Sequence, residues 1–188
     1  MKYKLTSNTK QICDVTLTQI EAVTSFSDVE QGDLGGWIES ENNLSQTDNA
    51  WVYSDAKVYG NAWVSDNAEV YGHAKVSGNA EVCGHAKVSG NAWVSDNAEV
   101  YGNAQVCGDM KIDNRNQIIN IIGSPYIITI TPEQTKIGCQ QHLNDEWRAF
   151  DDKQWVSFAS DALEFKSNWW PMVELGMRQV EGKGNIDE

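Results

Sequence analysis

The sequence predicts a mainly β protein, a parallel β-helix of hexapeptide repeats, and three observations lead to this fold class. Residues 48–113 divide into eleven consecutive hexapeptides. The third position is Ala in ten of the eleven, and the fifth position is Val or Ile in all of them. The first two positions carry Gly, Asp or Ser followed by Asn, Asp or His. A six-residue period excludes an α-helix, which has about 3.6 residues per turn.

The alternation inside each hexapeptide explains the fold. Ala and Val stand two residues apart, so on an extended strand both side chains point to one face and the residue between them points to the other. Gly, Asn and Asp favour turns because they tolerate unusual backbone angles. Each hexapeptide therefore predicts one short strand and one corner. Because a single strand cannot bury its apolar face alone, the hexapeptides must coil and stack, with strands about 4.8 Å apart.

The segment before the array does not repeat and predicts an N-terminal β cap over residues 1–33. Residues 2–5 and 16–23 have the composition of short strands. Ile38 and Leu44 continue the column of inward Ala residues, so the coil is expected to begin near Leu34. A cap is needed because a bare solenoid end exposes unpaired backbone groups.

The segment after the array changes composition and predicts a small C-terminal α+β module. Its expected elements are a hairpin of residues 126–131 and 135–139, a short helix over 145–150 and a longer helical region over about 157–180. Pro171 either kinks this helical region or starts a second helix. The predicted domains are residues 1–33, 34–113 and 114–188.

The array resembles the hexapeptide-repeat family through its V-x-G-N-A-x pattern. Together with the phrase Gly32–Ser40 and the phrase Ile137–Cys139 followed by Glu146 and Trp147, it is similar to phage and prophage proteins of the YdcK-like transferase family. This resemblance spans most of the chain. It implies left-handed coils of three hexapeptides each, and it supplies no established catalytic residues that match positions here.

Three hexapeptides per coil would sort the outward residues into three columns. The columns carry Trp51, Glu69, Lys87 and Gln105; then Lys57, Lys75, Trp93 and Lys111; then Trp63, Glu81 and Glu99. Exposed tryptophans are enriched at protein interfaces, although these could also lie beneath the terminal modules. The candidate protein-binding residues are Trp51, Trp63, Trp93, Glu81, Glu99, Trp169 and Trp170.

The sequence offers little for catalysis. Hexapeptide-repeat acyltransferases need a general base, usually His, and commonly a loop that interrupts the repeat. The array here has no interruption, and His73 and His85 stand twelve residues apart, hence on different faces. Cys139 and His142 could form a nucleophile pair, but their spacing alone is weak evidence for one. The four cysteines lack metal-ligand spacing, and no phosphate-binding glycine loop occurs. We therefore expect no catalytic residue, metal or cofactor.

The net charge of −13 is spread along the chain, which disfavours direct binding of nucleic acid or an anionic membrane. The chain lacks a long apolar run and begins without a signal-peptide pattern, so a cytoplasmic location is expected. We expect a non-enzymatic, phage-encoded binding protein that inhibits or sequesters a host protein of defence or DNA-binding machinery, with DNA mimicry as one mechanism. The alternatives are a coenzyme A-dependent acyltransferase and a self-assembling structural phage protein. A homo-oligomer, dimer or trimer, is also expected.

Overall fold

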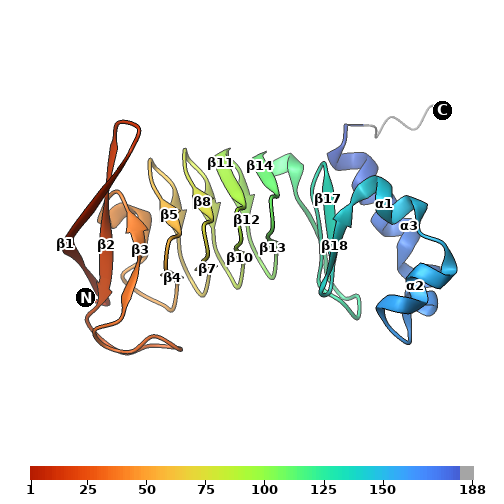
Figure 1. The fold of residues 1–188 in the computed structure, drawn as a ribbon, viewed down its shortest axis with the longest axis horizontal. Coiled ribbons are helices and arrows are strands. Elements are labelled where there is room, and N and C mark those ends of the chain that lie inside the picture. The colour runs from red at the N-terminus through yellow and green to blue at the C-terminus, as the bar shows by residue number, and fades with distance from the viewer. Residues whose placement is uncertain (183–188) are drawn as a thin grey trace. The chain divides into compact units, whose positions relative to one another are not determined.

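The computed structural model describes residues 1–182 and divides the chain into two compact units (Figure 1). The first unit comprises residues 1–115, and the second begins at Asn116. The first unit contains the repeats and is a parallel β-solenoid of about four coils, since one of its sheets stacks four repeat strands. The predicted fold class is therefore confirmed.

Every third hexapeptide strand of the array joins the same sheet. Sheet one contains β3 (Leu34–Ile38), β5 (Lys57–Val58), β8 (Lys75–Val76), β11 (Trp93–Asn97) and β14 (Lys111–Asn114). Sheet two contains β4 (Trp51–Val52), β7 (Glu69–Val70), β10 (Lys87–Val88) and β13 (Gln105–Val106). Sheet three contains β6 (Trp63–Val64), β9 (Glu81–Val82) and β12 (Glu99–Val100).

The register within these sheets fixes the length of a coil. Trp51 pairs with Glu69, and Glu69 pairs with Lys87, in parallel. Stacked neighbours such as Asn61 and Asn79 are thus 18 residues apart in sequence. The three outward columns inferred from the sequence are confirmed, and strands of successive coils lie side by side in Figure 1.

Two kinds of interaction hold the coils together. The inward Ala and Val side chains of the array are fully buried, as Ala80 and Val82 illustrate. Backbone hydrogen bonds join each coil to the next, for example from the N–H of Lys57 to the carbonyl of Ala74 at 3.0 Å. Each strand therefore has both a buried apolar face and a paired backbone, which no single hexapeptide can achieve alone.

The corners depend on a left-handed backbone and on asparagine ladders. Gly78 has a φ of 70°, and a Cβ placed there would lie 2.6 Å from the backbone nitrogen of Asp96 in the next coil. Side chains stack beside it: Nδ2 of Asn61 donates to Oδ1 of Asn79 at 3.0 Å, and Nδ2 of Asn79 donates to Oδ1 of Asn97 at 3.1 Å. This explains why Gly and Asn recur at the first two hexapeptide positions.

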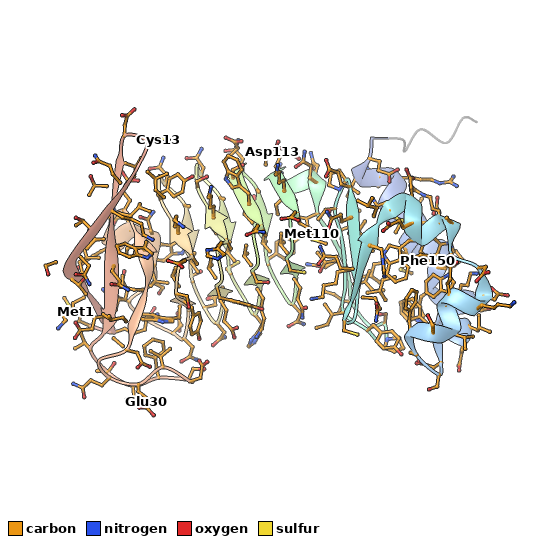
Figure 2. The ribbon with its side chains drawn as sticks, in the orientation of Figure 1. Met1, Cys13, Glu30, Met110, Asp113 and Phe150 are labelled. Atoms are coloured by element: carbon orange, nitrogen blue, oxygen red, sulfur yellow. The ribbon has the colours of Figure 1, made fainter. Side chains whose placement is uncertain are left out.

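The N-terminal segment adds antiparallel strands to sheet one. β1 (Tyr3–Ile12) and β2 (Val15–Ala22) form a hairpin that turns at Cys13 (Figure 2), and β2 pairs with β3. The first strand is longer than the segment expected from composition. β3 pairs antiparallel with β2 at Leu34 and in parallel with β5 at Trp37 and Ile38, so it joins the N-terminal hairpin to the coil. A short 3-10 helix, η1 (Glu41–Asn43), follows β3.

The second unit combines an antiparallel sheet with three helices. The sheet contains β15 (Ile119–Ile121), β16 (Ile128–Ile130), β17 (Gln134–Ile137) and β18 (Gln140–Leu143). The helices are α1 (Asn144–Ala149), α2 (Asp152–Phe158) and α3 (Ala162–Val180), and the 3-10 helix η2 (Arg115–Gln117) precedes the sheet. The predicted hairpin, formed by β16 and β17, and the predicted short helix are confirmed.

The prediction of one helical region over 157–180 is wrong at its start. The side chain of Asp151 caps α2 by accepting a hydrogen bond from the backbone N–H of Gln154 at 2.9 Å. Ala159, with φ −161° and ψ 158°, then ends α2 in an extended conformation. Pro171 lies inside α3, so it does not begin a new helix. Among the helices within residues 1–182, none combines the length and the apolar character needed to cross a membrane.

Candidate functional site

Three columns of outward side chains run along the three sheets of the solenoid, and they differ in charge. The acidic column consists of Trp63, Glu81 and Glu99 on sheet three. The basic column consists of Trp37, Lys57, Lys75, Trp93 and Lys111 on sheet one. The paired column consists of Trp51, Glu69, Lys87 and Gln105 on sheet two. Each column places its members at the strand spacing of about 4.8 Å.

The acidic column presents one tryptophan beside two carboxylates. Trp63 is 38% exposed and Glu81 is also exposed, while Glu99 is half-buried. Nη1 of Arg115 approaches Oε1 of Glu99 at 3.9 Å. Burial raises the pKa of the neighbouring Cys83 thiol, and the nearby carboxylates raise it further. Since the thiolate is the nucleophilic form, this cysteine is poorly suited to covalent chemistry.

The basic column gathers cations around two indole rings. Nζ of Lys10, from β1, lies 3.8 Å from the ring centroid of Trp37, and Nζ of Lys75 lies 5.6 Å from that of Trp93. Trp93 is 40% exposed, and its Nε1 donates to Oγ of Ser77 at 3.2 Å. Both indole rings are therefore bordered by positive charge, an arrangement that favours cation–π attraction, and the Trp93 ring is also held by its hydrogen bond.

Lys57 lies at the centre of this column, between two other ammonium groups. Burial lowers its pKa, and the charges of Lys10 and Lys75 lower it further, whereas Asp55 opposes the shift. Its Nζ donates to the backbone carbonyl of Asp55 at 2.8 Å. The carboxylate of Asp55 lies 3.6 Å from Nζ of Lys10 and 3.9 Å from Nδ1 of His73. Nearby positive charge on this face thus exceeds negative charge.

Trp37 of the basic column and the adjacent Lys10 were not identified from the sequence. Trp37 stands twenty residues before Lys57, because η1 lengthens the first coil, so counting in steps of eighteen misses it. Lys10 reaches the column from the hairpin of β1 and β2, which no repeat pattern predicts. The sequence did contain one signal for Trp37: the phrase Gly32–Ser40 includes a Trp and could have been interpreted as the strand that stacks on β5.

The paired column offers no free aromatic anchor, and the expectation that Trp51 is exposed is wrong. Trp51 is 1% exposed, and its ring packs against Tyr3 at 6.2 Å and Phe26 at 5.4 Å between centroids. The N-terminal segment covers Trp51. This large apolar side chain at the first coil closes the end of the core, where its burial is favourable. Glu69 and Lys87 neutralise one another through an ion pair of 2.8 Å.

The tail tryptophans Trp169 and Trp170 are half-buried and pack against the core of the second unit. The ring of Trp170 lies 5.5 Å from that of Trp155 and 6.5 Å from that of Trp147. Their surroundings favour a structural role, since aromatic pairs at these separations stabilise a core.

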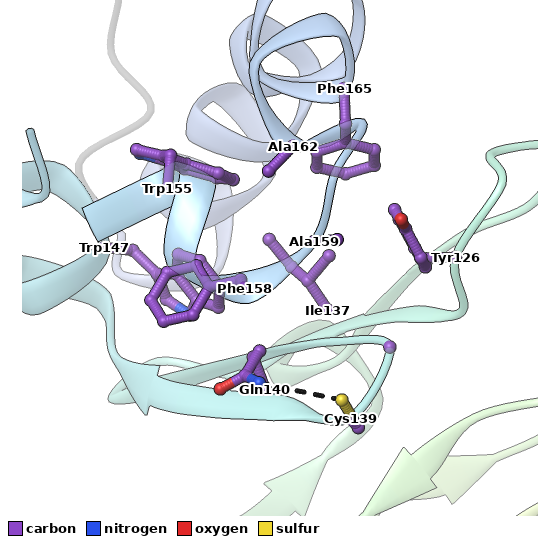
Figure 3. A pocket seen from close by; sticks show the side chains of 11 residues that line it. Tyr126, Ile137, Cys139, Gln140, Trp147, Trp155, Phe158, Ala159, Ala162 and Phe165 are labelled. Carbon is purple, nitrogen blue, oxygen red and sulfur yellow. Dashed lines mark hydrogen bonds between the residues drawn. The ribbon is translucent and has the colours of Figure 1, made fainter. Parts of the chain in front are cut away.

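A small apolar cavity of about 50 Å³ lies in the second unit (Figure 3). Side chains from several elements line it, among them Tyr126, Ile137, Trp155, Phe158 and Phe165. Few polar atoms face it, so it lacks the convergent polar groups that orient a substrate.

The side chains of Cys139 and His142 contact other residues and do not form a nucleophile pair. Sγ of Cys139 accepts a hydrogen bond from Nε2 of Gln140 at 3.6 Å (Figure 3). The ring of His142 packs instead against Trp147 and Phe150, and its Nδ1 lies 3.7 Å from Oε2 of Glu146.

The array histidines also stay apart: the backbone N–H of His73 donates to Gly90 and that of His85 donates to Gly102, at corners of different columns. Within residues 1–182, no group of three or more His, Cys, Asp or Glu side chains is arranged to hold a metal ion.

Comparison with known proteins gives a limited result. No family model matches the chain. A stretch of 40 residues is 48% identical to a protein of Escherichia coli (strain K12) named uncharacterized acetyltransferase YdcK. This stretch is 21% of the present chain and 12% of that protein, a smaller share than the resemblance in sequence implied. The similarity and the solenoid together support a relationship to hexapeptide-repeat proteins.

Proposed function

We propose that this chain is a non-catalytic binding protein that uses the acidic column to hold a basic protein surface. The observation that carries this proposal is the alignment of Trp63, Glu81 and Glu99 on successive coils. Coil-to-coil backbone hydrogen bonds fix the three positions before any partner arrives. Pre-organised aromatic and charged side chains lose little conformational freedom on binding, which favours affinity and specificity.

The partner we propose is a host protein with a basic surface, such as a DNA-binding or defence protein, which this chain inhibits or sequesters. Two observations support the sign of the charge: the net charge is −13, and the acidic column carries two carboxylates beside an exposed indole. Because the sequence resembles phage and prophage proteins, we propose that the partner belongs to a bacterial host. Two carboxylates make a short row, so we propose charge attraction to the basic surface without a duplex-like mimic of DNA.

Capture from a bacterial lysate tests this proposal. The tagged chain should retain a basic protein at stoichiometric yield, identified by mass spectrometry. Trp63→Ala and the double variant Glu81→Gln/Glu99→Gln should each reduce its capture at least tenfold. The matched control Glu30→Gln/Glu164→Gln changes the net charge equally at exposed positions outside the column, and it should capture normally. Equal loss in the control, or undiminished capture by the column variants, would contradict the proposal.

One observation favours a second function, acyl transfer: the 40-residue similarity to a protein named as an acetyltransferase. His73 and His85 lie at separate corners, so these two side chains do not form a catalytic pair for acyl transfer. Coenzyme A should raise the thermal unfolding midpoint if the chain binds it. An unchanged midpoint at millimolar coenzyme A would remove this alternative. A structural, self-assembling role predicts instead a stable oligomer of the purified chain in sedimentation measurements.

A further inference from the structure

We propose that the basic column, together with Lys10, binds a linear acidic polysaccharide that runs along the solenoid and carries uronic acid carboxylates. This site lies on sheet one, so it is separate from the acidic column and does not depend on the function proposed for that column. Its residues contribute two kinds of contact: ammonium groups for carboxylates, and the exposed indole of Trp93 for the apolar face of a sugar ring. The ring of Trp37 is half-buried beneath Nζ of Lys10, so it supports the cationic end of the row.

The first argument is the distribution of lysines. The array contains four lysines, and Lys57, Lys75 and Lys111 all lie in this one column, which holds no acidic residue. Lys57 and Lys75 are direct neighbours on adjacent parallel strands. Like charges at such positions destabilise a sheet. In a chain with 27 acidic and 14 basic residues, this segregation indicates a face adapted to an anion.

The second argument is the placement of the aromatic rings. Trp37 and Trp93 occupy the same column with Lys57 and Lys75 between them. Three strand spacings separate the two rings, about 14 Å along the solenoid. A rigid row that runs from the Lys10-covered ring of Trp37 through two lysines to the exposed ring of Trp93 fits an extended, regular polymer better than a compact small molecule. A sugar repeat has a length close to one strand spacing, so successive sugars would meet successive coils.

The third argument is the polar border of the column. Exposed His73 and Asn91 and half-buried Ser95 stand at corners next to Lys75 and Trp93. Nδ2 of Asn91 donates to Oδ1 of Asp109 at 3.1 Å. Hydrogen-bonding side chains at the edge of an aromatic and cationic row suit the hydroxyl groups of a sugar chain.

The charge pattern also separates this ligand from nucleic acid. Asp55 and Asp109 flank the column, and the whole chain carries −13. Duplex nucleic acid carries one phosphate charge per about 1.7 Å of its axis and needs dense positive charge to neutralise it. Four ammonium groups flanked by two corner carboxylates match a single polymer chain with one carboxylate per sugar better than such a duplex.

Isothermal titration with three hexameric probes tests the proposal: an alginate hexasaccharide, neutral maltohexaose and the oligonucleotide dT6. We expect the alginate hexasaccharide to bind wild-type protein and maltohexaose to bind at least tenfold more weakly. Lys57→Gln/Lys75→Gln and Trp93→Ala should each weaken alginate binding at least tenfold. The control Lys136→Gln/Lys153→Gln removes the same charge from the second unit and should bind as wild type does.

Three results would overturn the proposal: no alginate binding at millimolar probe, equal binding by the column variants, or column-dependent binding of dT6 that equals or exceeds that of alginate. Circular dichroism spectra and thermal midpoints establish that each variant is folded. Variants of Trp63, Glu81 and Glu99 should leave alginate binding intact, so failure here is distinguishable from failure of the proposed protein partner.

Discussion

Corner glycines offer a sharp test of how neighbouring coils pack. Gly78 and Gly102 both have positive φ, 70° and 67°, so an alanine at either position meets the same backbone strain. They differ in what lies next to the new Cβ. At Gly78 it would lie 2.6 Å from the nitrogen and 2.8 Å from the Cα of Asp96, whereas at Gly102 no atom lies within 4 Å.

The magnitudes follow from this difference. A left-handed conformation costs an L-residue about 1–2 kcal/mol, which is the loss expected for Gly102→Ala. Gly78→Ala adds overpacking against backbone, which costs roughly another 1–3 kcal/mol. We therefore expect the free energy of unfolding to fall by about 2–5 kcal/mol for Gly78→Ala.

Urea denaturation followed by circular dichroism measures both free energies. The informative quantity is the difference between the two variants, because the backbone strain is common to both. If Gly78→Ala destabilises the protein no more than Gly102→Ala does, the close approach of neighbouring coils at this corner is wrong.

Three further outcomes are expected. Burial lowers the pKa of Lys2 from 10.5 to about 8. Between these two pH values the unfolded chain therefore binds more protons than the folded chain. In urea titrations, the stability of the wild type relative to Lys2→Met should rise as the pH increases from 8 toward 10.5. Trp51→Ala should cost about 3–5 kcal/mol, because the ring is buried, whereas Trp63→Ala should change stability by about 0.5 kcal/mol; equal losses in denaturation would contradict the assigned burial. Arg148→Met should lower the thermal midpoint, since it leaves Glu181 without its paired guanidinium, and an unchanged midpoint would refute this role.

Much of the solenoid could be predicted from local sequence. Ala80 and Val82 face inward and Glu81 faces outward because side chains alternate along a strand, and this holds for every repeat. The three outward columns could be derived from the sequence once eighteen residues were assigned to each coil. What the repeat pattern does not contain is the way non-repeating segments fold onto it. Trp51 looks like any outward repeat residue, yet the side chains of Tyr3 and Phe26 cover it.

The same limit applies to the outward columns. Trp63 and Trp93 could be predicted to be exposed because both stand inside regular coils. Lys10 and Trp37 come from outside the array, so their contact depends on the β1–β2 hairpin and on the extra turn η1. Trp170 in the tail was a candidate for partner binding, and in the structure it is half-buried and its ring packs against Trp155.

Native mass spectrometry of the chain with its captured basic protein and acetyl-coenzyme A tests binding without catalysis most directly. We expect a stoichiometric complex in which the partner keeps its original mass, and we expect that complex to be lost with Glu81→Gln/Glu99→Gln. Transfer of an acetyl group to the partner, abolished by heat-denaturing the chain, would contradict the central claim and establish an acyltransferase.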